Sequence, residues 1–180
     1  MSNYNYTINY GNIKFCNASD GPGIRISIYF SGCRVHCPGC HNEVSWDFNY
    51  GKKFTTETMN EIIANLKQNY YNGISILGGE PLDPKNRKDV FHVISEVYEN
   101  TKKSIWLWTS YTFEDIIKNE IIPMDILKKI DVIVDGKFEI SKKDLRLFYR
   151  GSSNQRVIDV QESLNKQTIV KIKIKEEENL

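Results

Sequence analysis

The chain has 180 residues, of which 24 are Lys or Arg and 23 are Asp or Glu, so its formal net charge is +1. This length suits one compact domain with a hydrophobic core and is short for two. Because the charges nearly cancel, nothing in the balance favours nucleic acid or an anionic membrane as a partner. No apolar run approaches the ~20 residues that a membrane span needs, and the polar N-terminus lacks a signal-peptide pattern. We therefore expect a cytoplasmic protein.

Strand-like and helix-like patterns alternate along the first half of the chain. Residues 24–30 alternate at period two and are rich in β-branched and aromatic side chains, which predicts a strand. A helix is predicted behind the candidate caps Thr55 and Thr56, because apolar residues recur there at helical spacing: Met59, Ile62, Ile63 and Leu66. Residues 73–77 form a short apolar run that is typical of a buried strand.

The same alternation continues in the second half. Helical spacing recurs at Val90, Val93, Ile94, Val97 and Tyr98. Further on, the patterns predict strands at 104–109 and 131–135 and helices at 113–118 and 124–130, and residues 168–180 are expected to form a C-terminal strand with a frayed tail. Such alternation implies βαβ units around a mostly parallel sheet, in a single α/β domain over residues 1–180.

Polar and glycine-rich clusters follow the ends of the predicted strands. These clusters are the cysteine loop (residues 31–42, SGCRVHCPGCHN), the GGEP turn (78–81), TSY (109–111) and DGK (135–137). Because the carboxyl ends of parallel strands meet at one edge of a sheet, all four clusters are expected on the same rim. Four independent features at matching strand ends predict one active site.

Three cysteines in the cysteine loop have the spacing C-x3-C-x2-C: Cys33, Cys37 and Cys40. In a reducing compartment, clustered cysteines hold a metal or do redox work more often than they form disulfides. Two metal sites are compatible with this set. His36 or His41 could complete a structural Cys3His zinc site, or the three thiolates could hold a [4Fe-4S] cluster with one iron left open for a small molecule. Cys16 lies outside the motif and is expected to be a small buried residue without a cluster role.

The GGEP turn has two interpretations. On its own it is an ordinary glycine pair at the end of a strand, closed by Pro81. Beside a cysteine cluster, the lack of Cβ atoms at Gly78 and Gly79 would let a ligand approach the backbone closely. The second interpretation is favoured because the turn is predicted to share the rim with the cysteines.

The motifs together resemble a known family. DGPGIRISIYFSGCRVHCPGCHN combines G-x-G-x-R, a strand and C-x3-C-x2-C, and is similar to the signature of the glycyl-radical-enzyme activases, a branch of the radical S-adenosylmethionine (radical SAM) enzymes. ILGGEPLDPKNR, WLWTSYTFEDI, VIVDGKFE and YRGSSNQRVID extend the resemblance, which covers residues 20 to about 159. Within the branch, these segments resemble the activases of the anaerobic (class III) ribonucleoside-triphosphate reductase. The fold that this implies is an incomplete (β/α) barrel of radical SAM type.

The resemblance implies roles for individual residues. Cys33, Cys37 and Cys40 would each bind one iron of a [4Fe-4S] cluster, and the fourth iron would chelate the amino and carboxylate groups of S-adenosylmethionine. The methionine and ribose parts of that cofactor would lie against the residues of the other clusters: Gly78, Gly79, Glu80, Thr109, Ser110, Asp135 and Lys137. The wider superfamily often has an aromatic residue before the third cysteine, where this chain has Gly39, so His41 or Trp46 would stack near the adenine. Residues 157–160 would border the adenine, and Arg25 would lie near the cluster or under the partner's loop.

The implied activity is reductive cleavage of S-adenosylmethionine to a 5′-deoxyadenosyl radical, which abstracts a Cα hydrogen from a glycine of the partner enzyme. The partner would be the large subunit of the anaerobic ribonucleoside-triphosphate reductase, and reduced flavodoxin is the expected electron donor. Two alternatives stay open. One is an activase of another glycyl-radical enzyme, of the pyruvate formate-lyase type. The other is a non-catalytic Cys3His zinc-binding interaction module.

Overall fold

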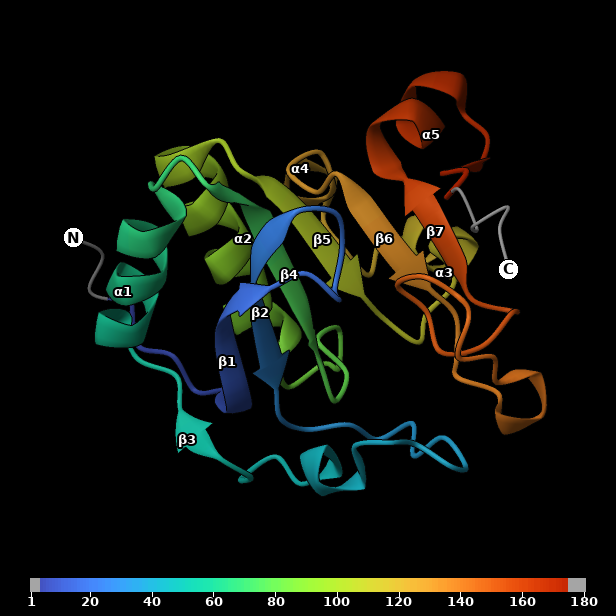
Figure 1. Cartoon of the computed structure of the whole chain (residues 1–180), viewed down its shortest axis with the longest axis horizontal. Helices are drawn as coiled ribbons and strands as arrows, with labels where there is room; N and C mark the ends of the chain where they lie inside the picture. Colours follow the sequence, from blue (N-terminus) through green and yellow to red (C-terminus); the bar gives the residue numbers. More distant parts are fainter. Residues whose placement is uncertain (1–3, 175–180) are drawn as a thin grey trace.

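The computed structural model describes residues 4–174 of the chain (Figure 1). The last six residues of the expected frayed tail, 175–180, lie outside the described part. The elements, in chain order, are β1 (Asn9–Asn17), β2 (Ile24–Phe30), the 3-10 helix η1 (Glu43–Trp46), β3 (Lys52–Lys53), α1 (Thr56–Leu66), β4 (Tyr71–Gly78), α2 (Arg87–Thr101), β5 (Ser104–Trp108), α3 (Phe113–Lys118), α4 (Met124–Leu127), β6 (Val132–Asp135), the 3-10 helix η2 (Ile140–Lys142), β7 (Arg156–Asp159), α5 (Val160–Lys166) and β8 (Val170–Lys171).

One open, eight-stranded mixed sheet organises the described residues, in the order β3-β1-β2-β4-β5-β6-β7-β8. The α/β prediction is confirmed, but the prediction of a mostly parallel sheet is wrong. Three of the strand pairings within residues 4–174 are parallel and four are antiparallel. The parallel pairings join the four central strands β2, β4, β5 and β6. The antiparallel ones come from short or irregular strands added toward both edges. Among these, the sequence patterns predict only the C-terminal strand, which is present as β8.

The four parallel strands end at one rim of the sheet. Phe30 at the end of β2 pairs with Gly78 at the end of β4, and Trp108 at the end of β5 pairs with Val134 near the end of β6. The cysteine loop, the GGEP turn and residues 109–112 therefore leave the sheet side by side. The rim that the sequence predicts is present, and it positions the site described below.

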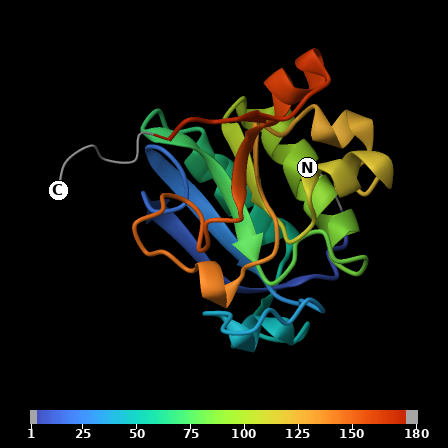
Figure 2. The ribbon, with the colours of Figure 1, turned by 90° about the vertical axis from the view of Figure 1, so that its right-hand side faces the viewer.

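Helices cover one face of the sheet, here called the helix side. Figure 2 shows α2, α3 and α4 on that side, with the segment after β6 on the other. The apolar side chains predicted on α1 and α2 are buried there, as expected from their spacing: Met59, Ile62, Ile63, Leu66, Val90, Val93, Ile94 and Val97. Tyr98 is 40 % exposed and does not join them. Thr55 caps α1 by accepting a hydrogen bond from the Thr58 amide at 3.2 Å.

The other face of the sheet, here called the cavity side, carries the alternate residues of each strand. In β6, for example, Ile133 belongs to the helix-side core, whereas Val132 and Val134 pack in a smaller cluster with Trp106 and Val157. The cavity side therefore keeps space between the sheet and the segment that follows β6. No helix within residues 4–174 is both long and apolar enough to cross a membrane.

Candidate functional site

The cysteine loop is held at the rim by backbone hydrogen bonds to η1. The amide of Gly32 donates to the Ser45 carbonyl at 2.7 Å, and the amide of Cys33 donates to the Trp46 carbonyl at 3.1 Å. All three cysteines of the motif are free thiols; Cys33 is buried, and Cys37 and Cys40 are half-buried. The motif therefore offers three reduced thiols on one short loop.

A cavity of about 410 Å³ opens beside this loop, on the cavity side of the sheet. Most of the residues singled out in the sequence line it together: Cys33, Cys37, Cys40, His41, Gly78, Gly79, Glu80, Thr109 and Ser110. Ligand sites for small molecules commonly fall in this size range. The three thiols share this wall, and within residues 4–174 no group of three or more Cys, His, Asp or Glu side chains is placed to hold a single metal ion.

Backbone amides point at two of the thiol sulfurs. Burial raises the pKa of Cys33, and hydrogen bonds from the amides of Val35 and His36 act in the opposite direction. Burial likewise raises the pKa of Cys37, against a hydrogen bond from the Phe138 amide. Amide donors of this kind stabilise a thiolate, and around iron-sulfur clusters they also tune the reduction potential. The surroundings of the sulfurs thus suit a thiolate-bound cluster.

The glycines of the GGEP turn bring two loops into direct contact. A Cβ atom on Gly78, whose φ is +122°, would lie 2.1 Å from the Phe30 carbonyl oxygen. On Gly79 it would lie 2.5 Å from the carbonyl oxygen of Gly32 and 2.9 Å from that of Ser45. Both positions therefore require glycine because of neighbouring backbone.

Glu80 joins the GGEP turn to the end of β5. Its side chain is buried, and one oxygen accepts hydrogen bonds from the Leu82 amide at 2.9 Å and the Thr109 hydroxyl at 2.8 Å. The other oxygen accepts from the amide and the hydroxyl of Ser110, at 2.7 and 2.5 Å. Burial raises the pKa of Glu80, while these four hydrogen bonds act to lower it. These four hydrogen bonds tie the GGEP turn to the segment that follows β5.

Asn86 is a second connector, which the sequence did not single out. Its buried side-chain amide donates to the carbonyls of Ser31, Gly32 and Glu80, at 3.1, 3.1 and 3.0 Å. One side chain thereby fixes the start of the cysteine loop to the GGEP turn. Asn86 occurs in a turn-forming stretch, so nothing in its local sequence distinguishes it from a surface asparagine.

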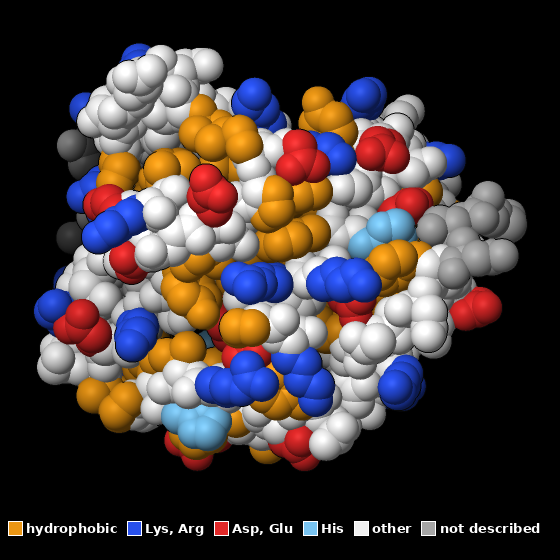
Figure 3. Space-filling view, turned by 180° about the vertical axis from the view of Figure 1, so that it is seen from behind, with side chains coloured by type: hydrophobic (Ala, Val, Ile, Leu, Met, Phe, Trp, Pro, Cys, Tyr) orange, Lys and Arg blue, Asp and Glu red, His pale blue; other side chains and the backbone are white. Residues whose placement is uncertain are grey.

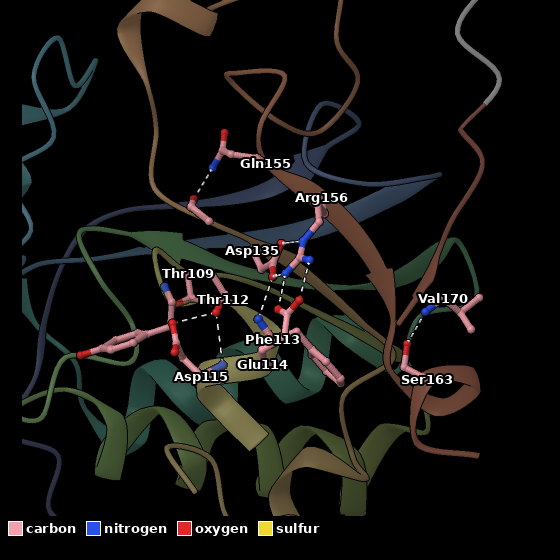
Figure 4. Close-up of polar contacts among 12 residues, drawn as sticks. Thr109, Thr112, Phe113, Glu114, Asp115, Asp135, Gln155, Arg156, Ser163 and Val170 are labelled. Atoms are coloured by element: carbon pink, nitrogen blue, oxygen red, sulfur yellow. Dashed lines mark hydrogen bonds and ion pairs between the residues drawn. The ribbon is translucent and has the colours of Figure 1, made fainter. Parts of the chain in front are cut away.

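Asp135 and Lys137 do not line the main cavity. They lie in an adjoining hollow that shares Ser110 and Gly136 with it. The buried carboxylate of Asp135 accepts hydrogen bonds from the Phe113 amide at 2.7 Å and from two nitrogens of Arg156 at 2.9 and 2.5 Å (Figure 4). The reason is strand alternation: Asp135 follows Ile133 on the helix side of β6, beside α3.

Arg156 is clamped between two carboxylates. Besides Asp135, it contacts both oxygens of Glu114 at 2.9 and 2.6 Å, and Figure 4 shows the guanidinium between the two acids. The hydrogen bond from Arg156 lowers the pKa of Glu114 to about 2, and the two carboxylates raise the pKa of Arg156. This ion triad joins the end of β6 and the start of β7 to α3.

Four further expectations can be compared with the structure. Trp46 lines the cavity and stacks on His36 with ring centroids 4.3 Å apart. Residues 157–160 are not part of the lining, although Gln155 is.

The placement of Arg25 near the cysteine loop was wrong: it is fully buried at the opposite end of the strands, where it donates to the hydroxyls of Ser75 and Ser104. The burial expected for Cys16 was also wrong, because this residue is exposed.

The comparisons with known proteins support an iron-sulfur cluster in this chain. Residues 19–158 match the family model described as a 4Fe-4S single cluster domain. The anaerobic ribonucleoside-triphosphate reductase-activating protein of Enterobacteria phage T4 is 39 % identical over 151 residues, covering 83 % of this chain and 93 % of the relative.

Bacterial relatives with the same description are similar to the chain over almost as much of its length. The one from Salmonella typhi is 40 % identical over 141 residues (77 % of this chain, 90 % of the relative), and the one from Escherichia coli K12 is 37 % identical over 153 residues (83 % and 97 %). The chain therefore belongs to the family of anaerobic ribonucleoside-triphosphate reductase-activating proteins.

Proposed function

We propose that this protein activates an anaerobic ribonucleoside-triphosphate reductase as a radical SAM enzyme, with a [4Fe-4S] cluster held by Cys33, Cys37 and Cys40. When bound, the cluster supplies the electron that cleaves S-adenosylmethionine to methionine and a 5′-deoxyadenosyl radical, the species that takes a Cα hydrogen from a glycine of the reductase. The observation that carries the proposal is the common wall on which these three thiols lie with the GGEP turn.

The donor set fits such a cluster. Three reduced thiols, two of them with amide donors at their sulfurs, face a cavity large enough for a nucleoside-sized ligand. Backbone hydrogen bonds from Gly32 and Cys33 to η1 would hold the start of the cysteine loop beside such a cluster.

The remaining wall would position S-adenosylmethionine. Gly78, Gly79 and Glu80 lie on one side of the cavity, Thr109 and Ser110 continue that wall, and His41 lies in the cysteine loop. Lys137 acts from the adjoining hollow, where its positive charge already favours the thiolate of Cys37. Asp135 lies in the same adjoining hollow, paired with Arg156, and would contribute to the site from there.

The open sheet would give the partner access to the cavity. The strand order runs from β3 at one edge to β8 at the other without closing, as an incomplete barrel would require. An open edge would admit an extended segment of another protein, in addition to the end of the strands where active sites of closed barrels open. The radical SAM domain would then span the chain as one unit.

Anaerobic reconstitution with iron and sulfide tests the proposal. We expect about four irons per chain and, after reduction, an electron paramagnetic resonance signal that changes shape when S-adenosylmethionine is added. Cys37→Ala should abolish cofactor cleavage and the change of shape, and Cys16→Ala is the matched control because that thiol is exposed and outside the cavity. A colourless protein that retains zinc, or cleavage retained in Cys37→Ala, would contradict the cluster assignment.

The partner is tested separately. The reduced protein, mixed with the anaerobic reductase and S-adenosylmethionine, should generate a glycyl radical signal on the reductase. Pyruvate formate-lyase serves as the comparison partner. A radical formed on pyruvate formate-lyase alone would contradict the choice of partner while leaving the cluster chemistry intact.

A further inference from the structure

A basic surface lies on the outside of the cysteine loop, built around the ring of Phe48. The guanidinium of Arg34 lies 4.9 Å from the centre of this ring, and the ammonium of Lys85 lies 4.6 Å from it. Arg87 follows at the start of α2, where its amide donates to the carbonyl of Asp83 at 2.9 Å, and the carboxylate of the same Asp83 pairs with Arg34. We call Arg34, Phe48, Lys85 and Arg87 the basic surface.

The basic surface is separate from the cavity. None of its four residues lines the cavity wall, and the neighbouring Tyr111 packs against the helix-side core. The view from the helix side shows Lys and Arg side chains gathered in the middle and lower part of that face, next to apolar surface (Figure 3). The cysteine loop thus lies between the cavity on one side and the basic surface on the other.

Short contacts connect the basic surface to the cysteines. Gly32, the residue before Cys33, lies so close to Phe48 that a Cβ atom there would be 2.1 Å from the ring. Arg34, the residue after Cys33, donates to the buried carboxylate of Asp83 at 2.6 Å, although its own side chain is 59 % exposed. A molecule seated on Phe48 would therefore lie next to the two residues that flank Cys33, one of the proposed cluster ligands.

The charges of this surface select its occupant. Arg34 is balanced by Asp83, but neither Lys85 nor Arg87 forms an ion pair among those found within residues 4–174. The nearby carboxylate of Asp47 accepts a hydrogen bond from the Asn49 amide in its own turn. The surface keeps positive charge beside an aromatic ring, and such a surface attracts an acidic protein by long-range steering.

We propose that the basic surface docks an acidic one-electron carrier protein, which reduces the cluster from the side opposite the cavity. This inference rests on the proposed function, because only a redox cluster needs an electron. One electron leaves the carrier, which is oxidised, and enters the cluster, which is reduced; no covalent bond forms or breaks. Since S-adenosylmethionine and the reductase would use the cavity side, the carrier can bind without displacing either.

Charge reversal tests the docking surface. The variants are Lys85→Glu, Arg87→Glu and the double variant; a carboxylate at residue 87 is compatible with its place at the start of α2. Lys85→Gln is a milder second variant. The matched control is Lys67→Glu, an equal change of charge at the end of α1, beside the opposite ends of the strands. Reduced flavodoxin is the acidic probe.

Two measurements are made on each variant. The first is the Kd of flavodoxin for the protein at two salt concentrations, which does not depend on activity. The second is the rate of cluster reduction after rapid mixing, with flavodoxin and, separately, with dithionite. We expect the double variant to raise the Kd and to slow reduction by flavodoxin roughly tenfold at low salt, with less effect at high salt. Reduction by dithionite and the Lys67→Glu control should stay at wild-type values.

Several results would overturn the proposal. One is an unchanged Kd and reduction rate in the double variant, and another is wild-type protein that does not bind flavodoxin. A double variant that binds flavodoxin normally but no longer binds the reductase would show that this surface serves the reductase. Failure of dithionite to reduce any cluster in the wild type would refute the proposed function, and the Kd measurement would still decide the docking surface.

Discussion

Replacing Gly79 by alanine tests the contact between the GGEP turn and the cysteine loop. The new methyl group would lie 2.5 Å from the carbonyl oxygen of Gly32 and 2.9 Å from that of Ser45, both of them backbone atoms. The closer contact is roughly 1 Å shorter than an ordinary van der Waals contact. Because backbone cannot rotate away as a side chain can, the turn and the loop must separate.

The free-energy cost of this separation can be estimated from the hydrogen bonds between the turn, the cysteine loop and η1. The amide of Glu80 donates to the Gly32 carbonyl at 2.9 Å, and the amide of Gly32 donates to Ser45 at 2.7 Å. Weakening two buried hydrogen bonds costs about 2 kcal/mol, and overpacking adds about 1–3 kcal/mol. We therefore expect the free energy of unfolding to fall by about 3–5 kcal/mol, and the iron bound after reconstitution to fall with it.

Urea unfolding of the metal-free protein under anaerobic conditions measures this change. The matched control is Gly151→Ala, where a Cβ atom would lie 3.1 Å from the ring of Phe138, a side chain that can yield. The control should lose less than about 1 kcal/mol. A loss below about 1 kcal/mol for Gly79→Ala, with normal iron content, would refute the reasoning that this glycine is required by neighbouring backbone.

Three other substitutions test the polar connectors. Arg156→Met leaves the buried carboxylate of Asp135 without its charged partner and should destabilise the fold by about 3 kcal/mol. The same change removes the cause of the low pKa of Glu114. In urea unfolding, the wild type should therefore lose stability between pH 4.5 and about 2 more steeply than the variant. Thr109→Val removes one hydrogen-bond donor to Glu80 and should lower the free energy of unfolding by about 1–2 kcal/mol in the same assay. A loss near zero would contradict a stabilising role for that hydrogen bond. Asp89→Ala removes the acceptor of the Thr7 and Ile8 amides, so hydrogen exchange at these two amides should accelerate at least tenfold; unchanged exchange would show that other contacts hold this segment.

The central part of the fold could be predicted because periodicity encodes it. The helix faces of α1 and α2 and the four parallel strands follow directly from apolar spacing, and the parallel arrangement brings the loops to one rim. Of the antiparallel strands toward the edges, only the C-terminal one was predicted, and just two residues of it pair as β8. β3 has two residues, too short for a periodic signal, and β1, next to this edge strand, has few buried side chains.

The site was predictable in composition but not in all its contacts. The cysteines and the GGEP turn were placed correctly on one cavity wall, because their positions depend on where strands end. The alternation of β6 could have shown that Asp135 shares a face with Ile133 and so points toward the helices. The roles of Asn86 and Arg156 had no such signal, because each depends on partners distant in sequence.

The hydrogen bonds of Glu80 determine what the cavity wall can offer to a ligand. The hydroxyls of Thr109 and Ser110 each have one hydrogen to donate, and both hydrogens are directed at the carboxylate. Toward the cavity these hydroxyls can therefore present only lone pairs. This part of the wall accepts hydrogen bonds and favours groups that carry N–H or O–H, such as an ammonium or a sugar hydroxyl. A ligand whose carbonyl or carboxylate faced this wall would meet acceptors without a partner hydrogen.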